Sequence, residues 1–529
     1  MTATSVARIR SLPGAGVAVP IAAAAALLVL WQVAAVTVLA GKGVIAAPSA
    51  IIGEIAGRPA VYATAIGATV SIAAIGWLAG NALAIVSALV FVQFRVAERL
   101  LLGVAVALVC VPLVAIMPIL QIAFDPTTTR IVLAAIAAYF PTLISTMVGL
   151  RSADPNQLTM YSSWGASRLQ ALLGVRVRNA LPGLFAGLQV AAPAALLGAI
   201  LGEFIGARAG LGTLIVTGLF TLDLDMTWAV AVITTAITTT LFWAIGAIGR
   251  RLTPWASTMS TGAPPTAAVG GGARRALVGL AFALASIALV LAAWWGFIAG
   301  FGLSPFFAKT PLDVLDYLFR SAGAADNRAI IAAGLCTTLV HTFVGYTVGL
   351  VVGIVTAIVF VATPPVERAA LPVLMMLRSV PLPVLLPLVI IAFGRGLAGV
   401  AVITAIVTFF PTLANTAAGL HRTPPDALLL ARSYAAGPLS TFWRVRLPFA
   451  VPSMLASARI AAPAAVLAST LAEWLATGDG LGHLMVSARA SQLFSQLWSA
   501  AVVLTVVSVV FYAIVSRAER TVLARFGAA

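Results

Sequence analysis

Lysine, histidine and cysteine are scarce in this 529-residue chain, and each shortage excludes a class of chemistry. The two lysines, Lys42 and Lys309, both lie outside the Gly-x-x-x-x-Gly-Lys-Ser/Thr pattern with which a P-loop binds nucleotide phosphates. The three histidines, His341, His421 and His483, are scattered, and no His-Glu-x-x-His pair marks a zinc site. We therefore expect this chain to have no nucleotide hydrolysis, no catalytic residues, and no metal or cofactor of its own.

Charged residues are also few, at 9% of the chain, whereas hydrophobic residues make up 61%. This balance excludes a soluble globular protein. The net charge of +16 fits short basic connections between membrane spans, so we do not expect a nucleic-acid partner. The two cysteines, Cys110 and Cys336, lie in apolar runs far apart in sequence, and we interpret them as small core residues and not as a disulfide or metal pair.

Long apolar runs of about 20 residues, enough to cross a bilayer as a helix, recur about twelve times along the chain. The runs are continuous and do not alternate as barrel strands would, which predicts an all-α integral membrane protein. Arginine is concentrated in the connections on the side of the N-terminus, so we expect both termini in the cytoplasm. The predicted spans lie near 17–40, 65–92, 100–123, 130–150, 185–206, 227–248, 276–300, 330–361, 369–393, 398–418, 453–475 and 498–516.

An internal repeat divides the chain into two similar halves. Phe140 to Leu143 recurs as Phe410 to Leu413, and Gly210-Leu211-Gly212 recurs as Gly480-Leu481-Gly482, each 270 residues later. The sequence therefore predicts a first repeat over 1–250, a cytoplasmic linker over 251–275 that is rich in Gly, Pro and Thr, and a second repeat over 276–529. Each half holds an even number of spans, so the two repeats are parallel, with a pseudo-two-fold axis along the membrane normal.

Each half has one long cytoplasmic connection, at about 151–181 and 421–451. Their spacing of apolar residues predicts short amphipathic helices joined by a turn at 165–167 in the first loop and at 436–438 in the second. Such helices could lie on the membrane face or enter a groove of a soluble partner.

The residues from Tyr161 to Ser167, with Val175-Arg176-Val177 after them, resemble the coupling-loop signature of ABC importer permeases. The second loop is similar, although the signature glycine is Ala435 there and Glu-Ala-Ala at its start is replaced in both loops. The segment from Glu203 to Gly212 and its repeat are similar to the nitrate, sulfonate and taurine branch. In that family the loop enters a cleft of the ATPase. The positions implied here are Tyr161, Trp164, Gly165, Ala166, Ala431, Tyr434, Ala435 and Ala436.

This resemblance implies a type I ABC importer permease of the bacterial plasma (inner) membrane. Two ABC ATPase subunits, which bind ATP and Mg²⁺, would be its motor. An extracytoplasmic solute-binding protein would dock on the outer loops near 207–226 and 477–496. The solute would be small and polar, with an anion such as a sulfonate, taurine or nitrate favoured, or a pyrimidine-type compound. Membrane lipid, in contact with the outer faces of the spans, would be a further partner.

Several residues within the spans are candidates for the translocation path. Prolines that interrupt the third span of each half free backbone carbonyls, which are tolerated only beside protein or water, although a packing kink is an equal alternative. Glu203 and Glu473 could line the path or hold the Gly-Leu-Gly loops by hydrogen bonds. Arg378 could meet an anionic solute, pair with a carboxylate, or reach the cytoplasmic surface. The proline candidates are Pro112, Pro118, Pro381 and Pro387.

The two halves are not equivalent. Arg378 and Arg459 have Val109 and Gln189 at the matching positions of the first half, and Arg178 interrupts the family pattern in the first half only. We therefore expect a path that is pseudo-symmetric at most, with solute recognition lopsided toward the second half. Two rival functions are an ion-coupled secondary transporter and a membrane scaffold or embedded enzyme without transport.

Overall fold

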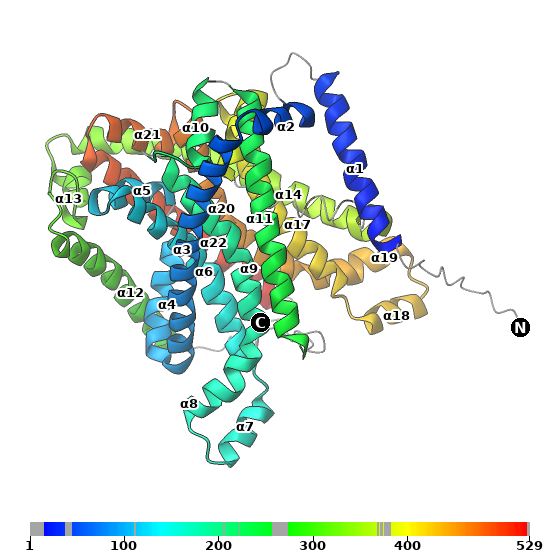
Figure 1. The fold of residues 1–529 in the computed structure, drawn as a ribbon. Coiled ribbons are helices and arrows are strands. Elements are labelled where there is room, and N and C mark those ends of the chain that lie inside the picture. The colour runs from blue at the N-terminus through cyan, green and yellow to red at the C-terminus, as the bar shows by residue number, and fades with distance from the viewer. Residues whose placement is uncertain are drawn as a thin grey trace, which may run out of the picture.

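The computed structural model describes residues 15–37, 45–110, 113–204, 207–221, 223–255, 273–367, 370, 374 and 382–525. Every regular element in these ranges is a helix, as predicted (Figure 1). In the first half the helices are α1 (Ala15–Val36), α2 (Pro48–Gly57), α3 (Pro59–Gln93), α4 (Arg95–Cys110), α5 (Leu113–Ala123), α6 (Pro126–Arg151), α7 (Pro155–Ser163), α8 (Arg168–Ala171), η1 (Leu172–Arg176), α9 (Val177–Glu203), α10 (Leu211–Thr221) and α11 (Leu224–Leu252). In the second half they are α12 (Ala273–Gly300), α13 (Pro311–Leu315), η3 (Asp316–Arg320), α14 (Ala324–Ala362), α16 (Leu382–Phe393), α17 (Leu397–His421), α18 (Pro425–Ser433), α19 (Pro438–Thr441), η4 (Phe442–Arg446), α20 (Leu447–Ala476), α21 (Gly480–Ala490) and α22 (Phe494–Arg525).

Within the described residues, nine helices are long and apolar enough to cross a membrane, and they confirm nine of the predicted spans. The first predicted span corresponds to α1. The span predicted over 100–123 is represented by two helices, α4 and α5, on either side of residues 111–112, and the span over 369–393 is described mainly by α16. Pro112, Arg378 and Pro381 lie outside the described residues.

The core of each lobe is a set of three helices, α3 with α6 and α9 in the first and α14 with α17 and α20 in the second. Glycines spaced four residues apart let the helices approach closely. Gly80 of α3 lies against the backbone of Ala135, and its repeat equivalent Gly349 lies against Ala405 of α17, where an added Cβ would stand 2.5 Å from the carbonyl oxygen. The same close approach therefore builds both lobes.

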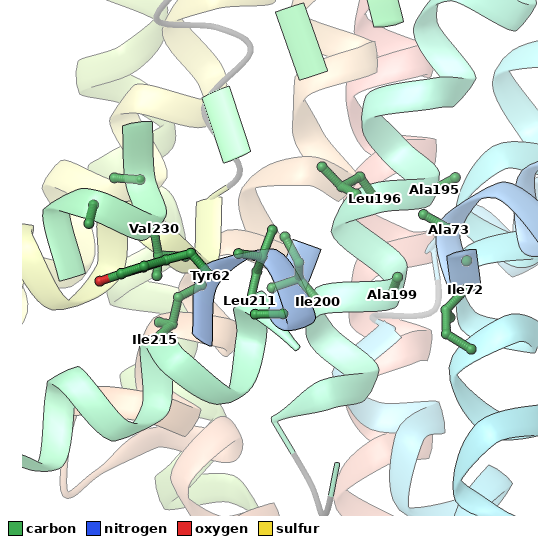
Figure 2. Packing of buried hydrophobic residues seen from close by; sticks show 14 of the residues in the cluster. Tyr62, Ile72, Ala73, Ala195, Leu196, Ala199, Ile200, Leu211, Ile215 and Val230 are labelled. Atoms are coloured by element: carbon green, nitrogen blue, oxygen red, sulfur yellow. The ribbon is translucent and has the colours of Figure 1, made fainter. Parts of the chain in front are cut away.

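Apolar side chains of four helices complete the first lobe around this core. Tyr62 of α3, Ile200 of α9 and Ile215 of α10 belong to one buried cluster, in which Leu211 is fully buried and Val230 of α11 also takes part (Figure 2). Because this cluster fixes α10 on α3 and α9, the helix Leu211–Thr221 has a defined position in the first lobe.

The two lobes exchange contacts at their edges. Helix α12, which begins the second half, packs against α4 of the first half (Figure 1). Ser286 Oγ donates a hydrogen bond of 2.7 Å to the carbonyl oxygen of Leu100, and the ring of Phe301 lies 5.3 Å from that of Phe124. The division of the sequence into repeats is therefore not a division into independently packed bodies.

The prediction that both cysteines are core residues is wrong for Cys336, which is exposed on α14. The side chain of Cys110 lies outside the described part of α4. An apolar run in a membrane span need not be buried in protein, because its outer face is covered by lipid. Hydropathy therefore did not distinguish the two environments.

Candidate functional site

The first long loop folds as a helical hairpin that protrudes from the bundle (Figure 1). Asp154 caps α7 by accepting a hydrogen bond of 2.8 Å from the backbone N–H of Asn156. The helix ends where Gly165 adopts a φ of +74°, and the N–H of Ala166 bonds to the carbonyl of Tyr161 at 3.1 Å. This pattern is a Schellman turn, whose left-handed residue is most often glycine.

The second long loop has the same turn with a different residue at its centre. Ala435 adopts a φ of +51°, and the N–H of Ala436 bonds to the carbonyl of Ala431 at 3.0 Å. Alanine in this left-handed conformation is strained by contact of its Cβ with the backbone. The signature glycine is thus missing from the second loop, but the backbone shape that it serves is kept.

Large apolar side chains at both turns face solvent. The exposed fraction is 71% for Trp164 and 80% for Tyr434, and these residues stand at equivalent positions. Leu169 and Leu439 on the following helices are exposed as well. Exposed aromatic and aliphatic groups gathered on a protruding hairpin are typical of a protein interaction surface.

The structure corrects the predicted outline of these loops in two respects. The second turn spans Tyr434 to Gly437 rather than 436–438, because Pro438 already begins α19, where its fixed φ is favourable. The helix after each turn is not a separate short element. It runs through η1 or η4 directly into the long α9 or α20.

At the other end of α9, a buried carboxylate fixes the start of α10. Glu203 accepts hydrogen bonds of 2.8 Å from the Thr69 hydroxyl and 2.7 Å from the backbone N–H of Gly212. Thr69 in turn accepts a bond of 2.8 Å from the N–H of Leu211. Gly210 has a φ of +152°, and a Cβ at this position would collide with the carboxylate. These contacts are those of the loop-holding alternative for Glu203.

The second lobe repeats this arrangement and adds a histidine. Glu473 accepts bonds of 2.8 Å from Thr338 and 3.0 Å from the N–H of Gly482. His341 Nδ1 lies 2.8 Å from the other carboxylate oxygen, and the position equivalent to His341 in the first lobe is Ile72. Both carboxylates are fully buried. The regions predicted as the outer loops contain the short helices α10 and α21, which these carboxylates hold.

Apolar side chains fill the interface between the lobes. Met117 of α5 and Leu386 of α16 are repeat equivalents, both are fully buried, and both belong to one cluster shared by the two lobes. Helix α5 also packs on α20, and α16 packs reciprocally on α9. Pro118 lies within α5 and Pro387 within α16. A constriction made of such side chains opposes the passage of water and ions.

One polar contact joins the lobes beside this cluster. Arg489 of α21 donates a hydrogen bond of 2.7 Å to the side-chain oxygen of Gln121 in α5. Burial lowers the pKa of the Arg489 guanidinium from its ordinary value, because the charge is partly withdrawn from water. A partly buried cation attracts an anion more strongly than a cation at an open surface does, because less water screens the two charges.

The two other unmatched arginines have partners in their own lobes. Arg459 forms an ion pair of 3.2 Å with Glu519 of α22, and the Arg178 guanidinium stands 5.6 Å from the ring centre of Trp255. Sequence reasoning missed Arg489, Gln121 and His341. The repeat register contained a signal for each, because Leu219, Ile390 and Ile72 stand at the equivalent positions.

Two segments of the chain, residues 80–254 and 349–526, match the model of one protein family, described as binding-protein-dependent transport system inner membrane component. Together the segments cover more than half of the chain, and their equivalent positions confirm the predicted duplication.

Individual relatives match over shorter stretches. A probable ABC transporter permease protein of Haemophilus influenzae is 31% identical over 28% of this chain and 60% of its own length. A riboflavin transport system permease protein of Chloroflexus aurantiacus is 34% identical over 31% of this chain and 61% of its own. A taurine transport system permease protein of Escherichia coli is 27% identical over 39% of this chain and 75% of its own length. The chain thus spans about three fifths of the length of the first two relatives.

Proposed function

Because the chain belongs to the family of binding-protein-dependent transport system inner membrane components, we propose that it forms both halves of the solute path of an ATP-driven importer. The observation that carries this proposal is the pair of protruding hairpins, one in each lobe, with the same Schellman turn and the same exposed aromatic position. Two like surfaces fit two ATPase subunits, one beneath each lobe. ATP and Mg²⁺ would be bound by those subunits, since this sequence has no P-loop.

The path would run between the lobes, where α5 and α16 meet α20 and α9. In the conformation described here the apolar cluster around Met117 and Leu386 would close it. Closure of the ATPases would move the two hairpins and, through the continuous helices α8–η1–α9 and α19–η4–α20, shift the lobes apart. Such a cycle alternates access without hydrolysis by this chain.

The solute would be a small polar molecule delivered by an extracytoplasmic binding protein at the α10 and α21 end. The partly buried guanidinium of Arg489 favours an anion, such as a sulfonate. The named relatives include taurine and riboflavin permeases. Their names support a small polar solute, but the solutes that they name differ in charge. We place the protein in the bacterial inner membrane with both termini cytoplasmic.

The test is purification of the chain from its native membrane with its partners, followed by ATPase and uptake assays in vesicles. Trp164→Ala and Tyr434→Ala should each lower uptake at least about tenfold, because an aromatic anchor of an interface is typically worth about 2 kcal/mol or more. The matched control is Phe343→Ala, since Phe343 is a similarly exposed aromatic on α14, away from the hairpins. Uptake that persists without ATP and collapses with an ion gradient would establish the secondary-transporter alternative.

A further inference from the structure

A cleft of about 670 Å³ lies at the base of the first hairpin. Its walls come from the turn between α3 and α4 and from the hairpin itself, including Leu158 of α7 and Ala171 of α8. Three arginines line it, Arg95, Arg168 and Arg176. A cleft of this size is in the range of small-molecule sites, and its charge selects for an anion.

Among the described residues, these three arginines have neither an acidic partner nor a ring contact, whereas two neighbouring arginines each have one or the other. Arg151 forms an ion pair with Glu98, and Arg99 lies over the ring of Phe282. Among the described residues, no carboxylate is within 4.0 Å of Arg95, Arg168 or Arg176. Arginine forms paired hydrogen bonds with phosphate oxygens, so three of them around one cleft can bind a phosphate group.

The apolar part of the cleft lies at the end of a membrane span. Helix α3 ends at Gln93, and the next residues on the wall, Phe94 and Val96, expose 61% and 62% of their surface. Exposed apolar residues beside a span end face the boundary between acyl chains and water. The lining of the cleft thus combines three cationic side chains with exposed apolar residues that a lipid can cover.

The fold does not require this set of charges. In the second lobe the positions of Arg95 and Arg168 are occupied by Pro364 and Pro438, and only Arg176 has an arginine equivalent, Arg446. Both lobes nevertheless form the hairpin with the same turn. The charges of the first lobe therefore serve something other than folding of the loop.

We propose that this cleft binds the phosphodiester headgroup of an anionic phospholipid, with an acyl chain against Phe94 and Val96. The lipid would touch both α7 and the α3–α4 turn, and so tie the first hairpin to the membrane surface. Nothing equivalent would hold the second hairpin. The proposal requires that the chain spans a membrane, and it is independent of the solute and of the ATPase.

The experiment is native mass spectrometry of the full-length chain released from detergent, titrated with phosphatidylglycerol and, separately, with phosphatidylcholine. The test variant is R95Q/R168Q/R176Q. The matched control is R422Q/R432Q/R444Q, which removes three exposed charges from the second loop region. Thermal unfolding of both variants checks that they are folded.

The wild type and the control should bind one phosphatidylglycerol in preference to phosphatidylcholine. The test variant should lose roughly a hundredfold in affinity, or about fivefold for each arginine replaced singly. An equal loss in both triple variants would mean general electrostatic attraction and would overturn the proposal. So would displacement of the lipid by inorganic phosphate at about tenfold excess, because a free anion would then be the ligand. Loss of ATPase co-purification by the test variant with lipid binding unchanged would assign the cleft to the ATPase instead.

Discussion

The guanidinium of Arg489 in the second lobe is hydrogen-bonded at 2.7 Å to the amide oxygen of Gln121 in the first. The equivalent pair would be Leu219 and Ile390, which cannot form such a bond, so this contact exists once in the molecule. It lies beside an apolar cluster to which both lobes contribute. Separation of the lobes would therefore break this polar contact on one side of the interface, with no equivalent bond on the other side.

Replacing either partner of this bond should weaken the interface between the lobes. Arg489→Leu and Gln121→Leu should each lower the free energy of unfolding by about 2 kcal/mol, the value of a hydrogen bond to a charged group. The double variant should cost clearly less than the sum, because both changes remove the same bond. Unfolding in mixed detergent micelles measures the three values, and strictly additive costs would show that the residues do not interact.

The strained alanine of the second hairpin should be improved by glycine. Ala435→Gly removes the Cβ contact at a positive φ and should stabilise the turn by about 0.5 to 1 kcal/mol, whereas Gly165→Ala should destabilise the first turn by a similar amount. Amide hydrogen exchange at Ala436, whose N–H closes the turn, should slow in A435G. Ala436→Gly is the control variant. Faster exchange at position 436 in both A435G and A436G than in the wild type would contradict the interpretation.

Replacing each buried glutamate by glutamine should destabilise the protein by different amounts in the two lobes. In Glu473→Gln the amide oxygen can keep the bonds from Thr338 and Gly482, and the NH₂ group can donate to His341 Nδ1 if the ring adopts the other tautomer.

In Glu203→Gln the NH₂ group instead faces the hydroxyl of Thr69, whose O–H then loses the carboxylate oxygen that accepts its hydrogen bond. One bond is lost, so E203Q should cost about 1 to 3 kcal/mol more than E473Q. Thermal unfolding of the two variants compares them directly. Equal destabilisation would mean that His341 does not compensate.

Close helix packing in the first lobe should depend on one glycine and not on another in the same helix. A Cβ at Gly80 would collide with the carbonyl of Ala135, so Gly80→Ala should cost about 2 kcal/mol or more through displacement of α6. Gly67 has open space around it, and Gly67→Ala should be neutral or slightly stabilising. Unfolding midpoints of the two variants provide the test, with similar losses counting against tight α3–α6 packing.

Much of the fold could be predicted because its determinants are local in sequence. The length of the apolar runs predicted the spans. The repeat register aligned Glu203 with Glu473 and the first hairpin with the second. The register could not show that Ala435 would adopt a glycine conformation, since the turn is held by bonds from its neighbours.

Contacts between distant residues were beyond these signals. Hydropathy cannot tell a lipid-facing residue from a core residue, as Cys336 illustrates. The bond between Gln121 and Arg489 joins residues from different repeats, and a periodic pattern carries no information about which faces of the two repeats meet.

The position of α12 against α4 has a consequence for how the protein is made. Synthesis proceeds from the N-terminus, so the first lobe enters the membrane before the helix that covers α4 has been translated. Until then the carbonyl of Leu100 lacks the Ser286 hydroxyl, and the face of α4 is open to lipid or to an insertion factor. Each lobe is completed only by its partner, so covalent fusion fixes the local concentration and the ratio of two parts that would otherwise have to find each other in the bilayer.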